Sequence, residues 1–318
     1  MTRVHLLGLA LLLGATPSLT AHPGRGIVVD SRGRVWFLDT NRDILWRLDG
    51  DSLVRIADGV HSDRLVLVGD SAVIAEDYFA SALRPRLERI AADTSHPRRG
   101  DARNLAEAPL AFLALDRHGN AHFALGGRVL LLAPDDSIRA RAGGLAQDVP
   151  VAAGFGPDGS LYVVVGNRVW GVAAQGLVFT VSDSGAYEFV SAVAVPSDSG
   201  LCVTDYGARR VHVYEGGGGA ARVVAWPWYP VGLAAGPDGA CYSLERRFRY
   251  GGAATLLGWT RDLLGTPRVR RLTPDGGAAV LVVVRRHGLL VPIGTFLVAA
   301  AVLMGLGITA RRRRRRAA

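Results

Sequence analysis

Residues 27–39 read Ile27-Val-Val-Asp30-Ser-Arg-Gly33-Arg-Val-Trp36-Phe-Leu-Asp39, which is an apolar run, an Asp-x-x-Gly turn and a second apolar run. A second clear copy begins at Phe155, and weaker copies begin near residues 115, 195 and 236, so the unit recurs about every forty residues. Repeats of this length made of short strands are typical of β-propellers, in which each repeat forms one four-stranded blade. The sequence therefore predicts an all-β fold, a six-bladed β-propeller over residues 24–284.

The turn signals also place the blades along the chain. We expect them at residues 24–59, 60–107, 108–147, 148–187, 188–227 and 228–284. In the first blade, the apolar runs predict strands at residues 27–30, 35–38, 44–48 and 53–57.

Two stretches carry a resemblance to known proteins. They are Gly26-Ile-Val-Val-Asp30-Ser-Arg-Gly33-Arg-Val-Trp36-Phe-Leu-Asp39-Thr-Asn41-Arg-Asp-Ile44 and Thr204-Asp205-Tyr-Gly-Ala-Arg-Arg210-Val. The pattern resembles NHL-repeat proteins and the wider group of six-bladed propellers that includes the gluconolactonase and senescence-marker family. The resemblance covers about residues 24–284 and specifies a fold better than an activity.

The resemblance also implies a possible metal site. Gluconolactonase-like proteins bind a divalent metal with acidic and Asn side chains around the mouth of the central channel. By register, the comparable loop positions in this chain are Asp39, Glu76, Asn167, Asp205 and Glu245. The alternative is that these Asp and Asn side chains cap turns by hydrogen bonding to the nearby backbone.

Segments at both ends of the chain indicate export and membrane anchoring. Residues 1–21 contain a basic start, a short apolar run and small residues before Ala21, which predicts a signal peptide; an uncleaved anchor is the alternative. Residues 289–310 contain no charged side chain and are long enough for a transmembrane helix. The arginines of residues 311–318 predict a cytoplasmic tail, with the propeller extracytoplasmic, in the periplasm or at the cell surface.

Charge gives little support for a nucleic-acid partner. The formal net charge is +9, but six arginines at residues 311–316 supply most of it, so the rest of the chain is nearly balanced. A nucleic-acid-binding protein spreads its basic residues over one folded face. The partners that we expect are membrane lipid, through the single span, and an unidentified protein or small-molecule ligand.

Long loops in blades 2 and 6 indicate a binding surface. Extra residues follow the second strand in both blades and emerge on the side where the last strand leads to the apolar segment. The aromatic and basic residues of these loops are Tyr78, Phe79, Arg246, Arg247, Phe248, Arg249, Tyr250 and Trp259. Two interpretations stay open: contact with the membrane interface, or a lid over the central channel.

Other chemical motifs are weak. The match to G-x-G-x-x-G at residues 154–159 precedes another strand rather than the helix that a dinucleotide site needs. Neither a zinc-type Cys/His spacing nor a G-x-S-x-G nucleophile motif occurs in the sequence. His122 aligns with Trp36, Tyr162 and Tyr242, so we expect it to pack between blades.

The two cysteines occupy similar places in adjacent repeats. Cys202 and Cys241 each lie two residues after a turn glycine, Gly200 and Gly239. Equivalent side chains point the same way from their own sheets, and packed sheets lie about 10 Å apart. A disulfide needs Cα atoms within about 7 Å. The alignment by glycines therefore predicts two buried free thiols.

These observations favour a binding, recognition or scaffolding module without a cofactor. The alternative is a metal-dependent, lactonase-like hydrolase of the gluconolactonase type, with a divalent cation as its cofactor. A catalytic ion needs several convergent ligands and an open coordination position. The two hypotheses therefore differ in whether the five candidate ligands meet.

Overall fold

The computed structural model describes residues 26–40, 42–60, 64–68, 71–75, 86–90, 103–104, 111–116, 120–125, 127–132, 138–145, 150–182, 186–197, 200–215, 221–225, 227–247 and 266–284. The chain divides into two compact units, Met1–Val283 and Val284–Ala318. Every described strand lies in the first unit.

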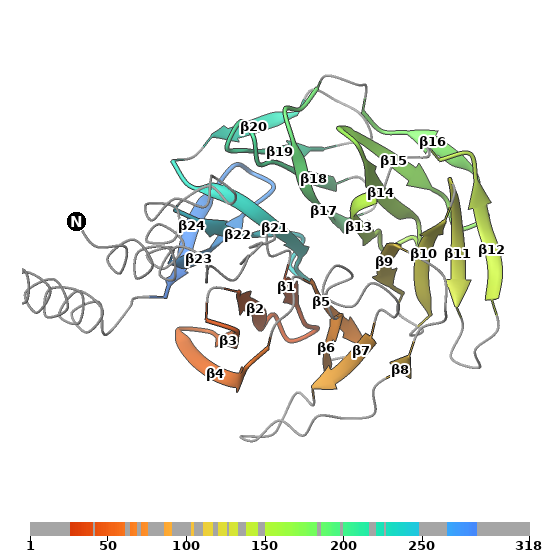
Figure 1. Cartoon of the computed structure of the whole chain (residues 1–318). Coiled ribbons are helices and arrows are strands. Elements are labelled where there is room, and N and C mark those ends of the chain that lie inside the picture. Colours follow the sequence, from red (N-terminus) through yellow and green to blue (C-terminus); the bar gives the residue numbers. More distant parts are fainter. Residues whose placement is uncertain are drawn as a thin grey trace, which may run out of the picture. The chain divides into compact units, whose positions relative to one another are not determined.

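In the described part of the chain, the strands form six four-stranded antiparallel sheets, each made of consecutive strands (Figure 1). Sheet 1 contains β1 (Ile27–Val29), β2 (Val35–Asp39), β3 (Ile44–Asp49) and β4 (Ser52–Asp58). Sheet 2 contains β5 (Arg64–Val68), β6 (Ser71–Ala75), β7 (Arg86–Ile90) and β8 (Arg103–Asn104). Sheet 3 contains β9 (Ala111–Leu115), β10 (Ala121–Leu125), β11 (Arg128–Leu132) and β12 (Ile138–Gly143).

The second half of the chain repeats this arrangement. Sheet 4 contains β13 (Pro150–Phe155), β14 (Leu161–Val165), β15 (Arg168–Val172) and β16 (Val178–Thr180). Sheet 5 contains β17 (Val190–Ser197), β18 (Gly200–Asp205), β19 (Arg210–Tyr214) and β20 (Arg222–Ala225). Sheet 6 contains β21 (Tyr229–Ala235), β22 (Cys241–Arg246), β23 (Pro267–Leu272) and β24 (Ala278–Val283). The predicted all-β fold is confirmed.

The first strands of consecutive sheets lie next to one another. Contacts join β1 to β5, β5 to β9, β9 to β13, β13 to β17 and β17 to β21, and β21 also contacts β1 (Figure 1). Each first strand therefore forms the inner edge of its sheet, as in a propeller. The glycine motif at residues 154–159 spans the end of β13 and the turn before β14, so the predicted strand–turn–strand arrangement is confirmed.

A buried carboxylate organises the turn between the first two strands. In sheet 1, Asp30 Oδ1 accepts hydrogen bonds from the backbone N–H groups of Arg32 (3.0 Å) and Arg34 (2.9 Å). Its Oδ2 accepts a third from Trp36 Nε1 at 3.0 Å. Gly33 completes the turn with a φ of +77°, a conformation that favours glycine. One carboxylate thus joins the turn between β1 and β2 to a buried ring on β2.

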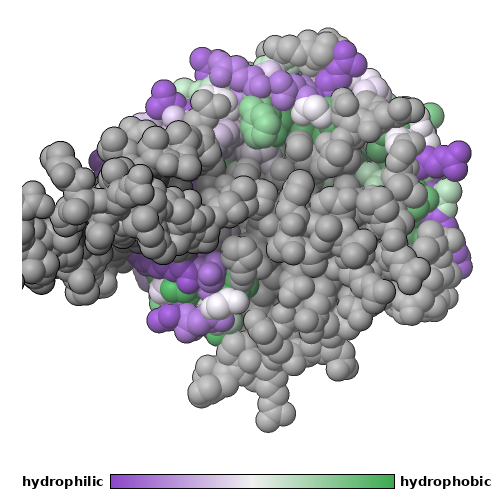
Figure 2. Space-filling view, viewed as in Figure 1, coloured by the Kyte–Doolittle hydropathy of each residue, from purple (hydrophilic) through white to green (hydrophobic). Residues whose placement is uncertain are grey.

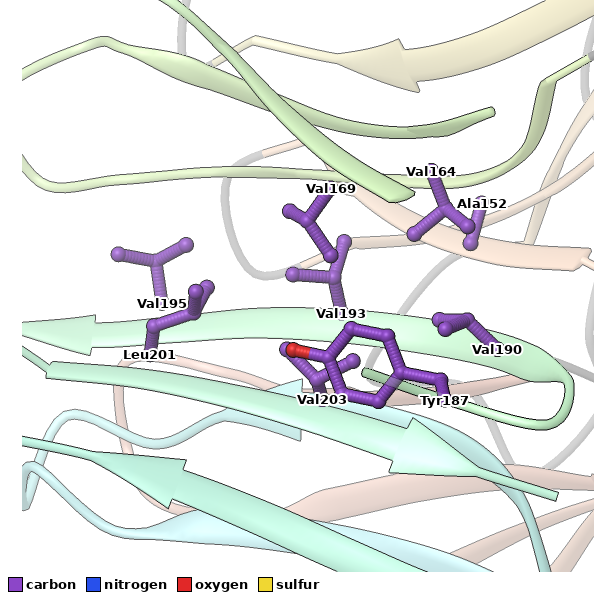
Figure 3. Packing of buried hydrophobic residues seen from close by; sticks show 9 residues of the cluster. All are labelled: Ala152, Val164, Val169, Tyr187, Val190, Val193, Val195, Leu201 and Val203. Carbon is purple, nitrogen blue, oxygen red and sulfur yellow. The ribbon is translucent and has the colours of Figure 1, made fainter. Parts of the chain in front are cut away.

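Apolar side chains fill the spaces between neighbouring sheets. Figure 3 shows Val164 and Val169 of sheet 4 close to Val193 and Val203 of sheet 5. All four side chains are buried. Full burial of a valine contributes about 1.5 kcal/mol or more, so such layers account for much of the stability of the fold.

His122 belongs to the equivalent layer between sheets 3 and 4. Its ring is fully buried and meets the ring of Phe155 edge-on, with the centroids 4.8 Å apart. Its Nε2 lies 3.2 Å from Asp116 Oδ2, in the same relation that Trp36 has to Asp30. The prediction that His122 packs between blades is confirmed.

The prediction of two free thiols is wrong. Cys202 and Cys241 form a disulfide, and their Cα atoms are 6.6 Å apart. Both cysteines are buried in the apolar layer between sheets 5 and 6. Neighbouring sheets therefore approach more closely here than the general spacing of packed sheets suggests.

The turn glycines were a misleading guide to the register. Counted from the equivalent strand ends Asp205 and Glu245, Cys202 is three residues back and Cys241 is four residues back. With the strand ends aligned, Gly239 corresponds to position 199 and Gly200 corresponds to Ala240, so the two turn glycines are offset by one residue. Because side chains alternate between faces, this offset turns the two sulfurs toward the same gap from opposite sides.

The predicted end segments lie outside the described residues. This applies to the signal peptide at residues 1–21, the transmembrane helix at residues 289–310 and the Arg-rich tail at residues 311–318. Within the described ranges, no helix is long and apolar enough to cross a membrane.

Candidate functional site

Four of the five candidate metal ligands lie where second strands end. Asp39 and Asp205 are the last residues of β2 and β18, Glu245 is the penultimate residue of β22, and Asn167 follows β14. The antiparallel order places these strand ends on one side of the sheets. Glu76 directly follows β6 and lies outside the described residues.

Asp205 stabilises local backbone structure. Its carboxylate accepts hydrogen bonds from the backbone N–H groups of Glu188 (3.0 Å), Phe189 (3.0 Å) and Ala208 (3.2 Å). It therefore joins the segment that leads into β17 to the turn that follows β18. Asn167 contributes to the same segment from sheet 4, since its exposed Nδ2 donates to the carbonyl oxygen of Glu188 at 2.8 Å. Only the contact from Ala208 is a local turn cap of the kind expected of Asp, and the others join segments that are far apart in the sequence.

Glu245 is an ion-pair residue. It is fully buried, and its carboxylate lies 2.5 Å from Arg268 Nε and 3.3 Å from Arg270 Nε, both on the adjacent strand β23. Burial raises the pKa of Glu245, while the positive charges of Arg270 and Arg268 oppose that change. Burial also lowers the pKa of Arg270 to about 10, so Arg270 remains charged near neutral pH.

Asp39 and Arg246 lie where sheets 6 and 1 meet. Asp39 is fully buried, with Arg42 Nε 3.6 Å from its Oδ2. Arg246 is also buried, and its Nη2 donates to Thr40 Oγ1 at 2.5 Å. This guanidinium, which we expected in a loop at the membrane interface or over the central channel, therefore contributes to the contact between the last and first sheets. Arg247 is exposed.

The other residues of the expected binding loops cannot be placed. They are Tyr78, Phe79, Phe248, Arg249, Tyr250 and Trp259, all of which lie outside the described residues. Both interpretations of these loops, as a membrane contact or as a channel lid, stay predictions.

The described carboxylates fit a metal ion poorly. Among the described residues, no group of three or more His, Cys, Asp or Glu side chains is placed to hold a metal. Asp205 already accepts three backbone hydrogen bonds, and Glu245 is paired with two guanidinium groups. A divalent ion needs oxygen ligands that converge on it. The proposed ligand set, which also includes Glu76, stays a prediction.

An aromatic cluster that the sequence reasoning missed lies on the same side of the molecule. The ring centroids of Phe189 and Tyr206 are 6.0 Å apart, and those of Tyr206 and Tyr229 are 5.2 Å apart. Arg209 lies over the Tyr229 ring at 5.3 Å, and Arg268 lies over a second aromatic ring at 4.0 Å. We call the whole group the aromatic–arginine rim; its members are Phe189, Tyr206, Arg209, Trp228, Tyr229 and Arg268.

The rim lies beside the gap between sheets 5 and 6. Arg268 and Leu272 are four residues apart on β23, so their side chains lie on the same face of the strand. Both therefore project toward the layer that contains the disulfide. Phe189 and Tyr206 flank β17 and β18 of sheet 5, whereas Tyr229 begins β21 of sheet 6. A sequence signal existed in the run Trp226-Pro-Trp228-Tyr229-Pro230, because aromatic residues before a strand need a structural or binding explanation.

Side-chain exposure and backbone conformation describe the rim further. Phe189 is 41% exposed, and its ring contacts that of Tyr206. Arg209 has a φ of +55°, and Asp43 at the equivalent turn position of sheet 1 has a φ of +54°, so this left-handed conformation belongs to the repeated turn. On the face shown in Figure 2, hydrophilic described residues in purple surround small hydrophobic patches in green.

Comparisons with known proteins identify the fold. Neither a protein-family model nor a curated protein sequence matches the chain. The virginiamycin B lyase of Staphylococcus aureus has a similar structure, with a TM-score of 0.52 and 15% identity, over 84% of this chain and 87% of the lyase. Regucalcin of Agrobacterium tumefaciens, described as a calcium-binding protein, has a TM-score of 0.52 and 18% identity, over 76% and 86%.

A putative gluconolactonase is similar at a TM-score of 0.50 and 20% identity, over 69% of this chain and 84% of that protein. Identities of this size show a shared fold and not a shared activity. The structural neighbours therefore include gluconolactonase-like and virginiamycin B lyase propellers, consistent with the resemblance carried by the repeats, and this chain has the β-propeller fold that these proteins share.

Proposed function

We propose that the chain is an exported, membrane-anchored, six-bladed β-propeller that binds a ligand rather than transforming one. The contact between β21 and β1 supports closure of the six sheets into a ring. The disulfide between Cys202 and Cys241 supports an oxidising compartment, where such bonds form and persist. The apolar residues 289–310 and the arginines after them supply the membrane anchor.

One observation carries the choice of binding over catalysis. The carboxylates of Asp205 and Glu245, which a lactonase-type metal site would need, are already engaged within the fold. Withdrawing the Asp205 carboxylate would leave three backbone donors without this acceptor, and withdrawing the Glu245 carboxylate would remove the anion beside two buried guanidinium groups. Each such loss costs about 1–3 kcal/mol. The same side of the propeller presents the aromatic–arginine rim, whose residue types are those enriched in binding hot spots.

A metal-dependent, lactonase-like hydrolase is the second candidate. It is favoured by the structural likeness to a putative gluconolactonase and to regucalcin, which is described as calcium-binding. In that case Glu76 and Asp39 would have to supply ligands together with residues that the observed contacts already occupy.

Calorimetric titration of the purified full-length protein with calcium, zinc and manganese separates the two candidates. We expect no tight binding and no turnover of lactones. Asp205→Ala should lower the stability of the metal-free protein because three backbone donors lose their acceptor. Asp51→Ala, at an exposed turn of sheet 1, is the control. Tight metal binding that is lost in both Glu76→Ala and Asp205→Ala, together with lactone turnover, would establish the hydrolase instead.

A further inference from the structure

We propose that the aromatic–arginine rim binds an oxyanion attached to an apolar ring, such as an aromatic carboxylate or phosphate. This inference rests on the proposed binding function and names the chemistry of its ligand. Two guanidinium groups would bind the anion, and the exposed ring of Phe189 would contact the apolar part.

The guanidinium groups are held in place by aromatic rings. Arg209 lies over Tyr229 at 5.3 Å, and Arg268 lies over Trp228 at 4.0 Å. Trp228 and Tyr229 are consecutive residues, so the two arginines flank one short stretch of chain. A guanidinium stacked on a ring keeps its N–H edge available for a carboxylate or phosphate, and it loses little freedom on binding.

Arg268 has a donor without a hydrogen-bond partner among the described residues. The residue is only 8% exposed, and its Nε donates to Glu245. Its Nη2 is buried without a hydrogen-bond partner in the structure. Buried donors in proteins nearly always have an acceptor, and an acceptor atom of a bound ligand would satisfy this one. An oxyanion oxygen is a stronger acceptor for a guanidinium than a neutral group.

The surrounding charge favours an anion. Near the described strand ends of sheets 4 and 5, Arg168, Arg209 and Arg210 are exposed, whereas Glu188 is the exposed acid among the described residues there. Asp205 is nearby, but its carboxylate is buried and accepts three backbone hydrogen bonds. The exposed charge is therefore positive, which attracts anionic ligands and raises their association rate.

The apolar part of the ligand is inferred from Phe189. Its ring is partly exposed and touches Tyr206, which continues to Tyr229 beneath Arg209. A ring placed on Phe189 would bury apolar surface next to the charged end of the rim. The rim thus combines one apolar contact and two cationic contacts.

Titration of the full-length protein in mild detergent, at constant ionic strength, tests this ligand chemistry. The probes are benzoate, phenyl phosphate, acetate and the neutral amide benzamide. We expect benzoate or phenyl phosphate to bind at least tenfold more tightly than benzamide and acetate. Whichever of benzoate and phenyl phosphate binds more tightly identifies the oxyanion as a carboxylate or a phosphate. Equal affinity for benzamide would overturn the proposal, and so would the absence of binding by any probe.

Matched variants locate the site. Arg209→Gln should weaken binding at least fivefold without unfolding the protein, because Arg209 is exposed. Phe189→Ser should weaken the binding of benzoate but leave the weak binding of acetate unchanged. Arg139→Gln, an exposed arginine on β12, is the charge-matched control and should have no effect. Equal weakening in Arg209→Gln and Arg139→Gln would show unspecific charge attraction and refute the site. Metal-dependent lactone turnover would instead contradict the proposed function, so the two failures are distinct.

Discussion

At the scale of single residues, His212 shows how burial changes side-chain chemistry in this fold. Its ring meets that of Tyr187 edge-on, with a centroid distance of 5.0 Å, between sheets 4 and 5. Its Nε2 is buried and has no hydrogen-bond partner within the described part of the chain. Burial lowers the pKa of His212; the charge of Asp205 opposes this change and that of Arg210 adds to it. The folded protein therefore favours the neutral imidazole.

This shift predicts a loss of stability in acid. Because the pKa of His212 is lower in the folded than in the unfolded state, the unfolded state binds more protons as the pH falls below about 6.5. The free energy of unfolding should thus decrease between about pH 7 and pH 5, by at most about 1.4 kcal/mol per pH unit for this group. His212→Phe keeps an aromatic ring and should flatten the dependence in urea unfolding. Identical slopes for both proteins would contradict the assignment.

At the scale of strands and sheets, the disulfide joins β18 to β22 across the gap between sheets 5 and 6. The two cysteines are 39 residues apart in the sequence. In the chain-entropy description, closing a loop of this size stabilises the folded state by about 4 kcal/mol. We therefore expect the Cys202→Ala, Cys241→Ala double variant to unfold at a markedly lower denaturant concentration.

Peptide mapping without reduction should recover the linked peptides from the wild-type protein. A reductant should destabilise the wild-type protein but leave the double variant unchanged. Recovery of unlinked, alkylated cysteines from protein isolated under oxidising conditions would contradict the bond.

The buried charges of β22 and β23 give a second prediction at this scale. Glu245→Gln leaves Arg268 and Arg270 without their carboxylate partner in a dry environment. Breaking a buried pair in this way costs about 3–5 kcal/mol. The control is Arg55→Gln, which removes the exposed pair with Asp58 and should cost about 1 kcal/mol or less. Chemical unfolding measures both, and comparable losses would show that Glu245 is not effectively buried.

At the scale of the whole molecule, the prediction concerns membrane topology. Residues 289–310 are apolar and the six arginines after them oppose translocation, so the propeller and the C-terminus should lie on opposite sides of the membrane. Protease added to intact spheroplasts should digest residues 24–284 and spare a tag placed after Ala318. Permeabilised cells are the control, in which the tag should also be lost. A protected propeller would reverse the orientation.

The features that the sequence determined by itself are local. Asp30 and Gly33 specify a turn through their own hydrogen bonds and backbone conformation, and each copy of the turn separates two apolar strands. That pattern was sufficient to predict the all-β fold, the strands of sheet 1 and the interior position of His122. Each of these depends on residues that are close together in the chain.

Only the tertiary structure decided which distant residues meet. A shift of one residue inverts the face of every side chain on a strand, so the one-residue offset between the turn glycines explains why Cys202 and Cys241 are bonded rather than unpaired. The pairing of Glu245 with Arg268 depends on the register of β22 and β23. The aromatic–arginine rim brings together residues from two sheets. Such contacts are set by strand register and sheet packing, which no local sequence pattern specifies.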